Sequence, residues 1–401
     1  MSKKTFKILL TTRHKRVHSG STIQLYLLAK ELVKRGHRVQ ALVNGERGKP
    51  LRDSLLPLEQ AGVKVEVAQL TKLKYGYTIP ELFWLRNFLA REQFDVINTF
   101  AGTDLSNLIP ASAGMFIPVL VAYRGLATPL DFFNSIKYRL PKLRKIIANS
   151  EAVKEIMVRS GQVPPEKITV IYGGFELERF RPEISGSKVR AEFSVPESAP
   201  LITIIGHVKF TPEHRKGGYY FWKAAEKVIE QRPDARFLMV GKVDRAKFEQ
   251  VASARLKAAS IITGFRADIP ELLAASDVLV NSSMSEGMAG VIRESLAMAK
   301  PVVATEIDGT PELVKPGETG ILVPPENPEA LAQGILELIG DRTRAAEMGR
   351  QGRKLVEKLC DNRERVDKYE RLYFEEYDKA TRVRHTFWRR AYWKRIMNDK
   401  L

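Results

Sequence analysis

The chain has 401 residues, which is too long for one ordinary hydrophobic core and fits two domains of about 150–200 residues each. Hydrophobic residues make up 44% of the sequence and charged residues 28%, a balance that excludes a disordered or fibrous protein. The formal net charge of +18 favours a polyanionic partner, which could be nucleic acid, an anionic membrane surface or a phosphorylated substrate.

The sequence carries no strong signal for export or membrane insertion. The start, Met1–Lys7, leads into a short apolar run without a small-residue cleavage site, and no apolar run reaches the roughly 20 residues of a spanning helix. We therefore expect a cytoplasmic protein. Cys360 is the only cysteine, which excludes an internal disulfide and a cysteine-rich metal site, and we expect it to be a packing residue.

Short β-branched runs alternate with longer helical patterns along the chain, which predicts parallel sheets built from β-α-β units. Strands of a first sheet are predicted at Lys7–Thr12, Arg38–Val43, Val63–Val67, Asp95–Thr99, Pro118–Ala122, Lys145–Asn149 and Ile168–Ile171. Strands of a second sheet are predicted at Leu201–Gly206, Arg236–Gly241, Ser260–Thr263, Asp277–Asn281, Pro301–Thr305 and Gly320–Val323. The pattern indicates an α/β protein with two doubly wound, Rossmann-like domains.

The boundary between the domains is predicted from composition. Residues 176–200 are rich in proline and have little apolar periodicity, which indicates a linker. We expect an N-terminal domain over residues 1–180, a C-terminal domain over 181–365 and a helical extension over 366–401. Open parallel sheets bind ligands beyond the carboxyl ends of their strands, so we expect the ligand in a cleft between the domains.

The C-terminal tail, residues 381–401, is both basic and aromatic. Trp388, Tyr392 and Ile396 recur at helical i, i+4 spacing, with arginines and lysines around them. Such a stripe suits an anionic membrane interface. The alternative is that the stripe packs on the first domain while the charges are solvated.

The segment Ser285–Gly290 is a loop between a predicted strand and a helix over Val291–Ala299. Backbone N–H groups of Met288, Ala289 and Gly290 at that helix start could hold phosphate or sugar oxygens. Gly287, like Gly290, permits close approach of a ligand to the backbone. The loop is therefore a candidate for donor binding.

Two glutamates lie in this segment. Glu286 and Glu294 would be about 80° apart on one ideal helix, but with Glu286 on the loop both can face a ligand. Carboxylates suit sugar and ribose because they accept hydrogen bonds from adjacent hydroxyl groups. The alternative is a glutamate favoured by the helix dipole and a second one that is solvated.

A basic loop follows the strand Leu201–Gly206 and precedes a helix predicted over Tyr219–Glu230. Lys216, together with His207, Lys209 or Arg215, could neutralise a diphosphate leaving group. The alternative is a solvated basic loop.

The first domain offers two further candidates at strand ends. Gly20 and Ser21 lie in the loop between the first strand and a helix predicted over Ile23–Gly36, where their N–H groups could contact a ligand. Ser21 is also a good N-cap, which would make the loop a simple turn. Arg124 follows the strand Pro118–Ala122 and is a candidate catalytic residue, although a lone arginine there is more often structural.

This ordered set of motifs resembles the retaining glycosyltransferase family 4, also called glycosyl transferases group 1, whose two Rossmann-like domains form the GT-B architecture. The resemblance covers nearly the whole chain. It rests on the loop at Gly20 and on the segments Ile147–Val153, Ile168–Gly174, Phe180–Pro182, Lys216–Gly217, Gly264–Arg266, Glu286–Glu294, Lys300–Thr305 and Gly309–Glu312. The segment Glu286–Glu294 is similar to the family's Glu-x7-Glu motif and is the most specific of these signals.

The resemblance implies a role for each matched residue. Glu286 would contact the transferred sugar, Glu294 the nucleotide ribose and Lys216 the diphosphate, while the backbone after Gly264 and Phe265 would border the base. Such enzymes retain the anomeric configuration and usually need no bound metal or other cofactor, in agreement with the absence of an Asp-x-Asp motif.

Three positions depart from the family pattern. His207 stands where the family has an arginine, so the second cation could be Lys209 or Arg215. Arg124 stands where many members have a histidine, and Gly173–Gly174 replaces the usual Asn-Gly pair. Sugar positioning and acceptor chemistry could differ accordingly.

We expect a hexosyltransferase-like enzyme that uses a nucleoside diphosphate sugar. Its acceptor would lie at the inner membrane face, for example a lipid-linked glycan or a lipopolysaccharide core, which would make the enzyme a peripheral membrane protein. A GT-B nucleotide-sugar epimerase is the closest alternative. A basic nucleic-acid-binding protein is disfavoured because no such module appears, and a nicotinamide enzyme would need Gly-x-Gly-x-x-Gly after the first strand.

Overall fold

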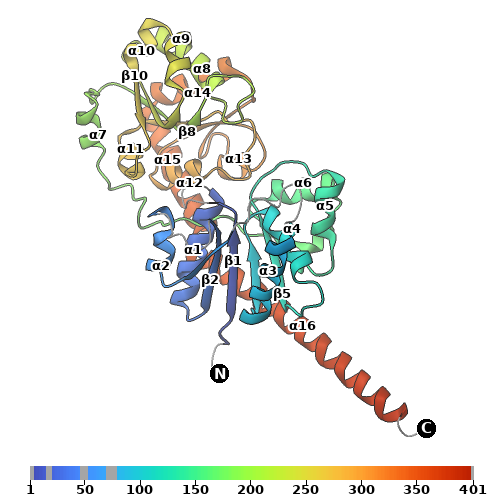
Figure 1. Ribbon diagram of the computed structural model, residues 1–401. Coiled ribbons are helices and arrows are strands. Elements are labelled where there is room, and N and C mark those ends of the chain that lie inside the picture. The colour runs from blue at the N-terminus through green and yellow to red at the C-terminus, as the bar shows by residue number, and fades with distance from the viewer. Residues whose placement is uncertain (1–3, 15–19, 46–52, 69–78, 399–401) are drawn as a thin grey trace. The chain divides into compact units, whose positions relative to one another are not determined.

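The computed structural model describes residues 4–14, 20–45, 53–68 and 79–398. The chain forms two compact units (Figure 1). Unit 1 comprises residues 1–125, 129–174 and 362–401, and unit 2 comprises residues 126–128 and 175–361. Both units are mixed α/β with a parallel sheet, which confirms the predicted Rossmann-like organisation.

The sheet of unit 1 has seven strands in the order β3-β2-β1-β4-β5-β6-β7, and all neighbours are parallel. The strands are β1 (Lys7–Thr12), β2 (Arg38–Asn44), β3 (Lys64–Ala68), β4 (Val96–Thr99), β5 (Val119–Arg124), β6 (Lys145–Ala148) and β7 (Ile168–Val170). Each predicted strand is present, with its ends moved by a few residues at most. Their β-branched and aliphatic side chains are buried because helices cover both faces of such a sheet.

The helices of unit 1 lie around this sheet (Figure 1). They are α1 (Gly20–Lys34), α2 (Leu56–Gln60), α3 (Ile79–Glu92), α4 (Gly102–Ala111), α5 (Phe132–Arg139), α6 (Glu151–Gly161) and α16 (Asn362–Asn398), with 3-10 turns at Asp53–Leu55 and Pro165–Lys167. The last helix belongs to this unit although it follows unit 2 in the chain.

The position of α16 corrects the predicted division into 1–180, 181–365 and 366–401. Val366, Tyr369 and Tyr373 are fully buried in the same core as Phe6 and Ile8 of the first strand. Apolar burial of this kind stabilises the unit, so the start of α16 is part of the first domain and not a separate extension. The chain therefore leaves unit 1 after Gly174 and returns to it at Asn362.

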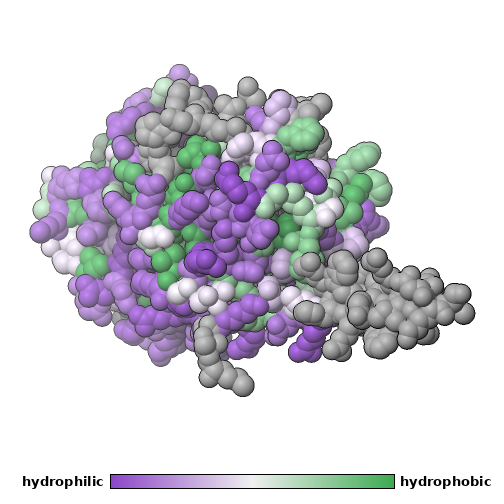
Figure 2. Space-filling model, turned by 60° about the horizontal axis from the view of Figure 1, so that its bottom comes forward, coloured by the Kyte–Doolittle hydropathy of each residue, from purple (hydrophilic) through white to green (hydrophobic). Residues whose placement is uncertain are grey.

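The tail beyond residue 383 remains helical to Asn398, but its side chains lie outside the described part of the structure. The predicted stripe of Trp388, Tyr392 and Ile396 falls there, so its role stays a prediction. Over the residues that can be described, no helix is long and apolar enough to cross a membrane. Figure 2 shows one face of the molecule, where hydrophilic residues predominate and apolar residues lie between them.

The sheet of unit 2 has six parallel strands in the order β10-β9-β8-β11-β12-β13. The strands are β8 (Leu201–Val208), β9 (Arg236–Val243), β10 (Ser260–Gly264), β11 (Val278–Asn281), β12 (Val302–Thr305) and β13 (Gly320–Val323). The helices are α7 (Ser187–Glu192), α8 (Gly218–Gln231), α9 (Arg245–Val251), α10 (Ala254–Ala259), α11 (Ile269–Ala275), α12 (Gly290–Ala297), α13 (Thr310–Leu313), α14 (Pro328–Gly340) and α15 (Arg342–Cys360).

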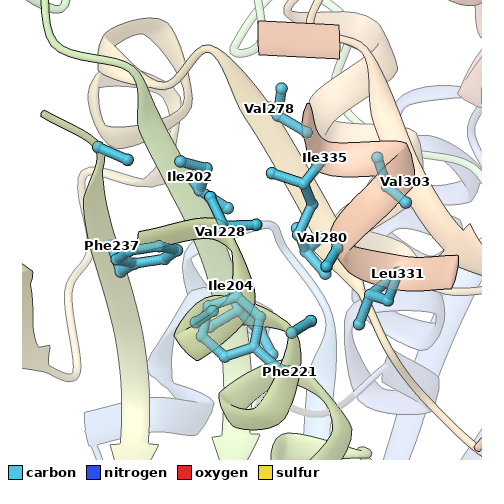
Figure 3. Packing of buried hydrophobic residues seen from close by; sticks show 14 of the residues in the cluster. Ile202, Ile204, Phe221, Val228, Phe237, Val278, Val280, Val303, Leu331 and Ile335 are labelled. Carbon is cyan, nitrogen blue, oxygen red and sulfur yellow. The ribbon is translucent and has the colours of Figure 1, made fainter. Parts of the chain in front are cut away.

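One core of unit 2 lies between the sheet and the helices α8 and α14 (Figure 3). Ile202 and Ile204 of β8 and Val280 of β11 meet Phe221 of α8 and Ile335 of α14 there. The packing fixes the starts of the helices relative to the carboxyl ends of the strands, where the candidate site lies. Cys360 is buried, as expected for a packing residue.

The predicted linker over 176–200 contains a docked helix, which corrects that prediction. Arg190 of α7 is buried and donates through Nη2 to Asp277 Oδ2 at 2.7 Å and through Nε to the Ala275 carbonyl at 3.0 Å. Gly186 lies so close to α11 that a Cβ on it would be 2.2 Å from the Ala275 nitrogen. These contacts attach the segment to unit 2.

Candidate functional site

The basic loop of unit 2 lies directly on the end of β11. Gly217 has φ of +62°, and a Cβ there would be 1.6 Å from the Ser282 carbonyl oxygen, so the position requires glycine. Ser282 Oγ donates to the Gly217 carbonyl at 2.9 Å, and the Met284 N–H donates to the Arg215 carbonyl at 2.7 Å. The loop before α8 and the segment before α12 therefore form one surface.

Glu286 is the centre of this surface. Lys216 Nζ donates to Glu286 Oε1, which also accepts from Ser283 Oγ at 3.0 Å. Arg215 Nη1 lies 3.7 Å from Glu286 Oε2. The Glu286 side chain is mostly buried, so these partners replace the water that a charged carboxylate would otherwise bind. The structure thus brings together two of the residues that the sequence singled out, Lys216 and Glu286.

Two hydrogen bonds fix the backbone around Glu286. The Glu286 N–H donates to Asp308 Oδ2 at 2.8 Å, and Arg215 Nη1 donates to the Ser285 carbonyl at 2.7 Å. Asp308 itself adopts φ of +41°, an uncommon value that aspartate tolerates better than most residues. Ser283 and Asp308 were not identified from the sequence, although a carboxylate three residues after β12 was a signal that could have found Asp308.

The structure separates the three candidates for the second cation. Arg215 lies against Glu286, whereas the Lys209 side chain is exposed to solvent. The His207 ring packs edge-on against His214, with centroids 4.8 Å apart. Burial lowers the pKa of both histidines, and the next causes are the charge of Lys242 for His207 and that of His207 for His214, so both rings are mostly neutral at neutral pH. Arg215 therefore shares the carboxylate of Glu286 with Lys216.

The predicted helix start is also present. The helix α12 begins at Gly290 with Ala289 at its N-cap, a residue without a side-chain acceptor. Gly287, Met288 and Ala289 lead into it, and all three are buried. The first N–H groups of a helix point away from it and favour anions, so this terminus suits phosphate or sugar oxygens.

Glu294 lies one turn into α12. One of its carboxylate oxygens is 3.9 Å from the point that a Cβ on Gly290 would occupy, which places the carboxylate beside the helix start. Burial raises the pKa of Glu294, while the charges of Arg293 and Arg179 act in the opposite direction. Gly264 ends β10 with φ of +77°, and the Phe265 side chain after it is 71% exposed.

In unit 1, Arg124 is the last residue of β5. Burial raises the pKa of Tyr138, while the charge of Arg124 and a hydrogen bond from it act in the opposite direction, which places the guanidinium beside the phenol.

Gly20 begins α1 and Ser21 is its second residue, so the predicted N-cap role of Ser21 is wrong. His18 and Ser19 lie outside the described residues.

No group of three His, Cys, Asp or Glu side chains that could hold a metal ion occurs among the residues described. The absence of a metal requirement stays a prediction, and so do the assigned roles of the site residues.

Two Rossmann-like units, with a basic loop against a Glu-x7-Glu segment, define the class of GT-B glycosyltransferases. Residues 18–179 match the family described as Glycosyltransferase Family 4, and residues 199–341 match Glycosyl transferases group 1. The chain belongs to this family, and it is a glycosyltransferase.

Known proteins agree with this assignment. The chain is 27% identical over 322 residues to the Escherichia coli UDP-Gal:alpha-D-GlcNAc-diphosphoundecaprenol alpha-1,3-galactosyltransferase, covering 73% of this chain and 79% of that protein. Anabaena HepE, solved with UDP and glucose, aligns with a TM-score of 0.77 and 23% identity over 92% of this chain and 100% of its own. WaaG, a glycosyltransferase involved in lipopolysaccharide biosynthesis, aligns with a TM-score of 0.69 and 17% identity over 90% and 98%.

Proposed function

We propose that this protein transfers a hexose-like unit, with retention of configuration, from a uridine diphosphate sugar to a lipid-linked glycan. The observation that carries the proposal is the ion pair of Lys216 with Glu286, next to Arg215 and to the start of α12. Two cations and a helix N-terminus on one surface suit a diphosphate, which carries the charge released when a nucleotide sugar breaks.

The chemistry follows from the charges. As the bond between the sugar and the diphosphate breaks, negative charge grows on the leaving oxygen, and Lys216 and Arg215 stabilise it. The ribose would be held by the carboxylate of Glu294, which accepts hydrogen bonds from its hydroxyl groups. Glu286 would accept hydrogen bonds from the sugar. Arg124 of unit 1 would bind a substrate.

The choice of nucleotide and acceptor rests on the relatives. HepE was solved with UDP, and the E. coli relative acts on a diphosphoundecaprenol-linked sugar. We therefore favour UDP as the nucleotide and a lipid-linked glycan over a lipopolysaccharide core. The net charge of +18 supports an enzyme that works peripherally at the inner face of a membrane, and the basic tail over 381–401 would add to this attraction.

A panel of nucleoside diphosphate sugars tests the proposal. Thermal shift and slow donor hydrolysis are expected to single out one uridine diphosphate sugar, and Lys216→Ala and Glu294→Gln are expected to abolish the response. If no donor shifts the unfolding temperature and none is hydrolysed, the assignment of this surface as a donor site is wrong. Conversion of the donor to its epimer, without transfer or hydrolysis, would support the epimerase alternative instead.

A further inference from the structure

Three cations of unit 1 lie at one edge of its sheet. Arg13 directly follows β1, and Arg124 is the last residue of β5. Both strands pair with β4 in parallel, so their carboxyl ends meet at the same edge. The third cation, Lys137, lies on α5. Burial, and then the charge of Arg124, lower the pKa of Lys137. The Asp131 carboxylate acts in the opposite direction, and the charge of Arg13 adds to the lowering, so two like charges converge on this lysine.

The ammonium of Lys137 lies at the start of α4. It donates to Ser106 Oγ at 3.1 Å, and it is 3.6 Å from the point that a Cβ on Gly102, the first residue of α4, would occupy. A helix start carries positive partial charge, so a cation is unfavourable there unless an anion joins it. Asp104 offsets this charge only in part at neutral pH, because burial raises its pKa to about 7.

The outer side of α5 is apolar and exposed. Phe132 is 64% exposed, Phe133 is 83% exposed and Ile136 is 39% exposed. The guanidinium of Arg139 lies 5.3 Å from the centre of the Phe132 ring. Two adjacent phenylalanines in water are costly, and aromatic side chains beside cations are characteristic of segments that lie at a membrane interface. Phe133 and Lys137 are one helical turn apart, so the apolar side adjoins the cations.

We propose that α5 docks this protein onto a membrane lipid that carries a phosphate or diphosphate group. Phe132, Phe133 and Ile136 enter the interface, and Lys137, together with Arg124 and Arg13, binds the phosphate. The proposal rests on the proposed function only in that it gives the lipid-linked acceptor a binding site. It is independent of the donor and of Lys216.

Flotation of the full-length chain with vesicles tests the proposal. Phosphatidylcholine vesicles with phosphatidic acid present a phosphate monoester, and phosphatidylcholine alone is the comparison. We expect recovery with phosphatidic acid to fall severalfold in F132S/F133S and in K137Q. Two matched controls, F83S at a phenylalanine that is 61% exposed on α3 and K154Q on α6, are expected to float like the unchanged protein. The C-terminal tail is present in every variant, so its contribution cancels.

Pyrophosphate distinguishes a lipid phosphate from a free one. It is expected to release the unchanged protein from the vesicles, and K137Q is expected to be insensitive to it. If K137Q floats like the unchanged protein but binds pyrophosphate less well, the site takes a soluble phosphate and the lipid proposal is overturned. Equal recovery of F132S/F133S and F83S would overturn it as well.

Thermal unfolding separates loss of docking from loss of fold. F132S/F133S is expected to unfold at or above the temperature of the unchanged protein, because the two rings are exposed. A normal donor response in variants that no longer float leaves the proposed function intact. If the unchanged protein floats normally but responds to no donor, the proposed function is wrong and the docking proposal still holds.

Discussion

The Lys216 ammonium donates a hydrogen bond to the Glu286 carboxylate although 70 positions separate the two residues. The pair holds the lysine charge at the surface formed by the loop before α8 and the segment before α12. Without a donor, the carboxylate is the partner of the lysine. Under the proposed function, Lys216 would exchange that partner for a phosphate oxygen of the donor, and no new charge would have to be buried.

Lys216→Ala is therefore expected to lower kcat/KM for the donor by about 10²–10³, the usual cost of removing one charge-stabilising donor from a reaction site. Steady-state kinetics with the donor found in the panel measures the change. Lys209→Ala is the matched control, because that lysine is on the same loop but exposed, and its kinetics are expected to stay unchanged. A similar loss in both variants would mean that the loop acts only through its overall charge.

Gly217→Ala is expected to distort the same surface through the backbone. The φ of +62° and the 1.6 Å approach to the Ser282 carbonyl exclude a methyl group without movement of β11 or of α8. The cost is roughly 2–4 kcal/mol of stability, seen as a lower midpoint of thermal unfolding. Gly340→Ala at the end of α14, where a Cβ would meet nothing within 4 Å, is expected to unfold like the unchanged protein.

The strands of both sheets could be predicted because buried parallel strands consist of short β-branched runs that few other structures use. The loop with Glu286 and the helix that starts at Gly290 and carries Glu294 could be predicted because they are contiguous in one segment, while the roles of the two glutamates stay predictions. The pairing of Glu286 with Lys216 could only be expected from the family resemblance, since no spacing rule connects residues so far apart. Ser283 gave no signal at all, because a serine after a strand is common.

The errors concern charged residues that the fold buries. Arg190 and Arg365 are almost inaccessible, yet their sequence surroundings are those of a linker and of a solvated helix. Arg365 Nη2 donates to the Gln24 carbonyl of α1 at 3.0 Å, and a sequence does not show which carbonyl will be in reach. For this reason α7 was missed, and α16 was assigned to an extension.

Arg190→Ala is expected to destabilise unit 2 strongly. The side chain is the anchor of α7 and donates to Asp277 and to the carbonyls of Ala275, Pro196 and Ala199. Its removal leaves a carboxylate and these carbonyls without their donor, at a cost of about 3–5 kcal/mol. Urea-induced unfolding measures the loss. Lys188→Ala, on the exposed side of the same helix, is expected to have no effect, and equal stability of the two variants would mean that α7 is not docked in solution.

The buried carboxyl of Asp104 makes stability depend on pH. It accepts a hydrogen bond from Thr11 Oγ1 at 3.0 Å, and burial raises its pKa from 3.8 to about 7. The folded chain therefore keeps a proton that the unfolded chain has already released between these two pH values. The Asp104 carboxyl makes its full contribution to the free energy of unfolding below about pH 4, and this contribution declines as the pH rises towards 7.

Asp104→Asn keeps an oxygen for Thr11 but cannot ionise, so the variant should not lose this part of its stability. Relative to the unchanged protein, its free energy of unfolding is expected to rise by roughly 1–4 kcal/mol between about pH 5 and about pH 8. Urea titrations of both proteins across that range measure the difference. Asp131→Asn is the matched control, because the Asp131 carboxyl is exposed and its pKa is lowered by hydrogen bonds from Asn134, so its contribution does not decline in this window. Parallel curves for Asp104→Asn and the unchanged protein would show that the Asp104 carboxyl is hydrated and ionised in the folded chain.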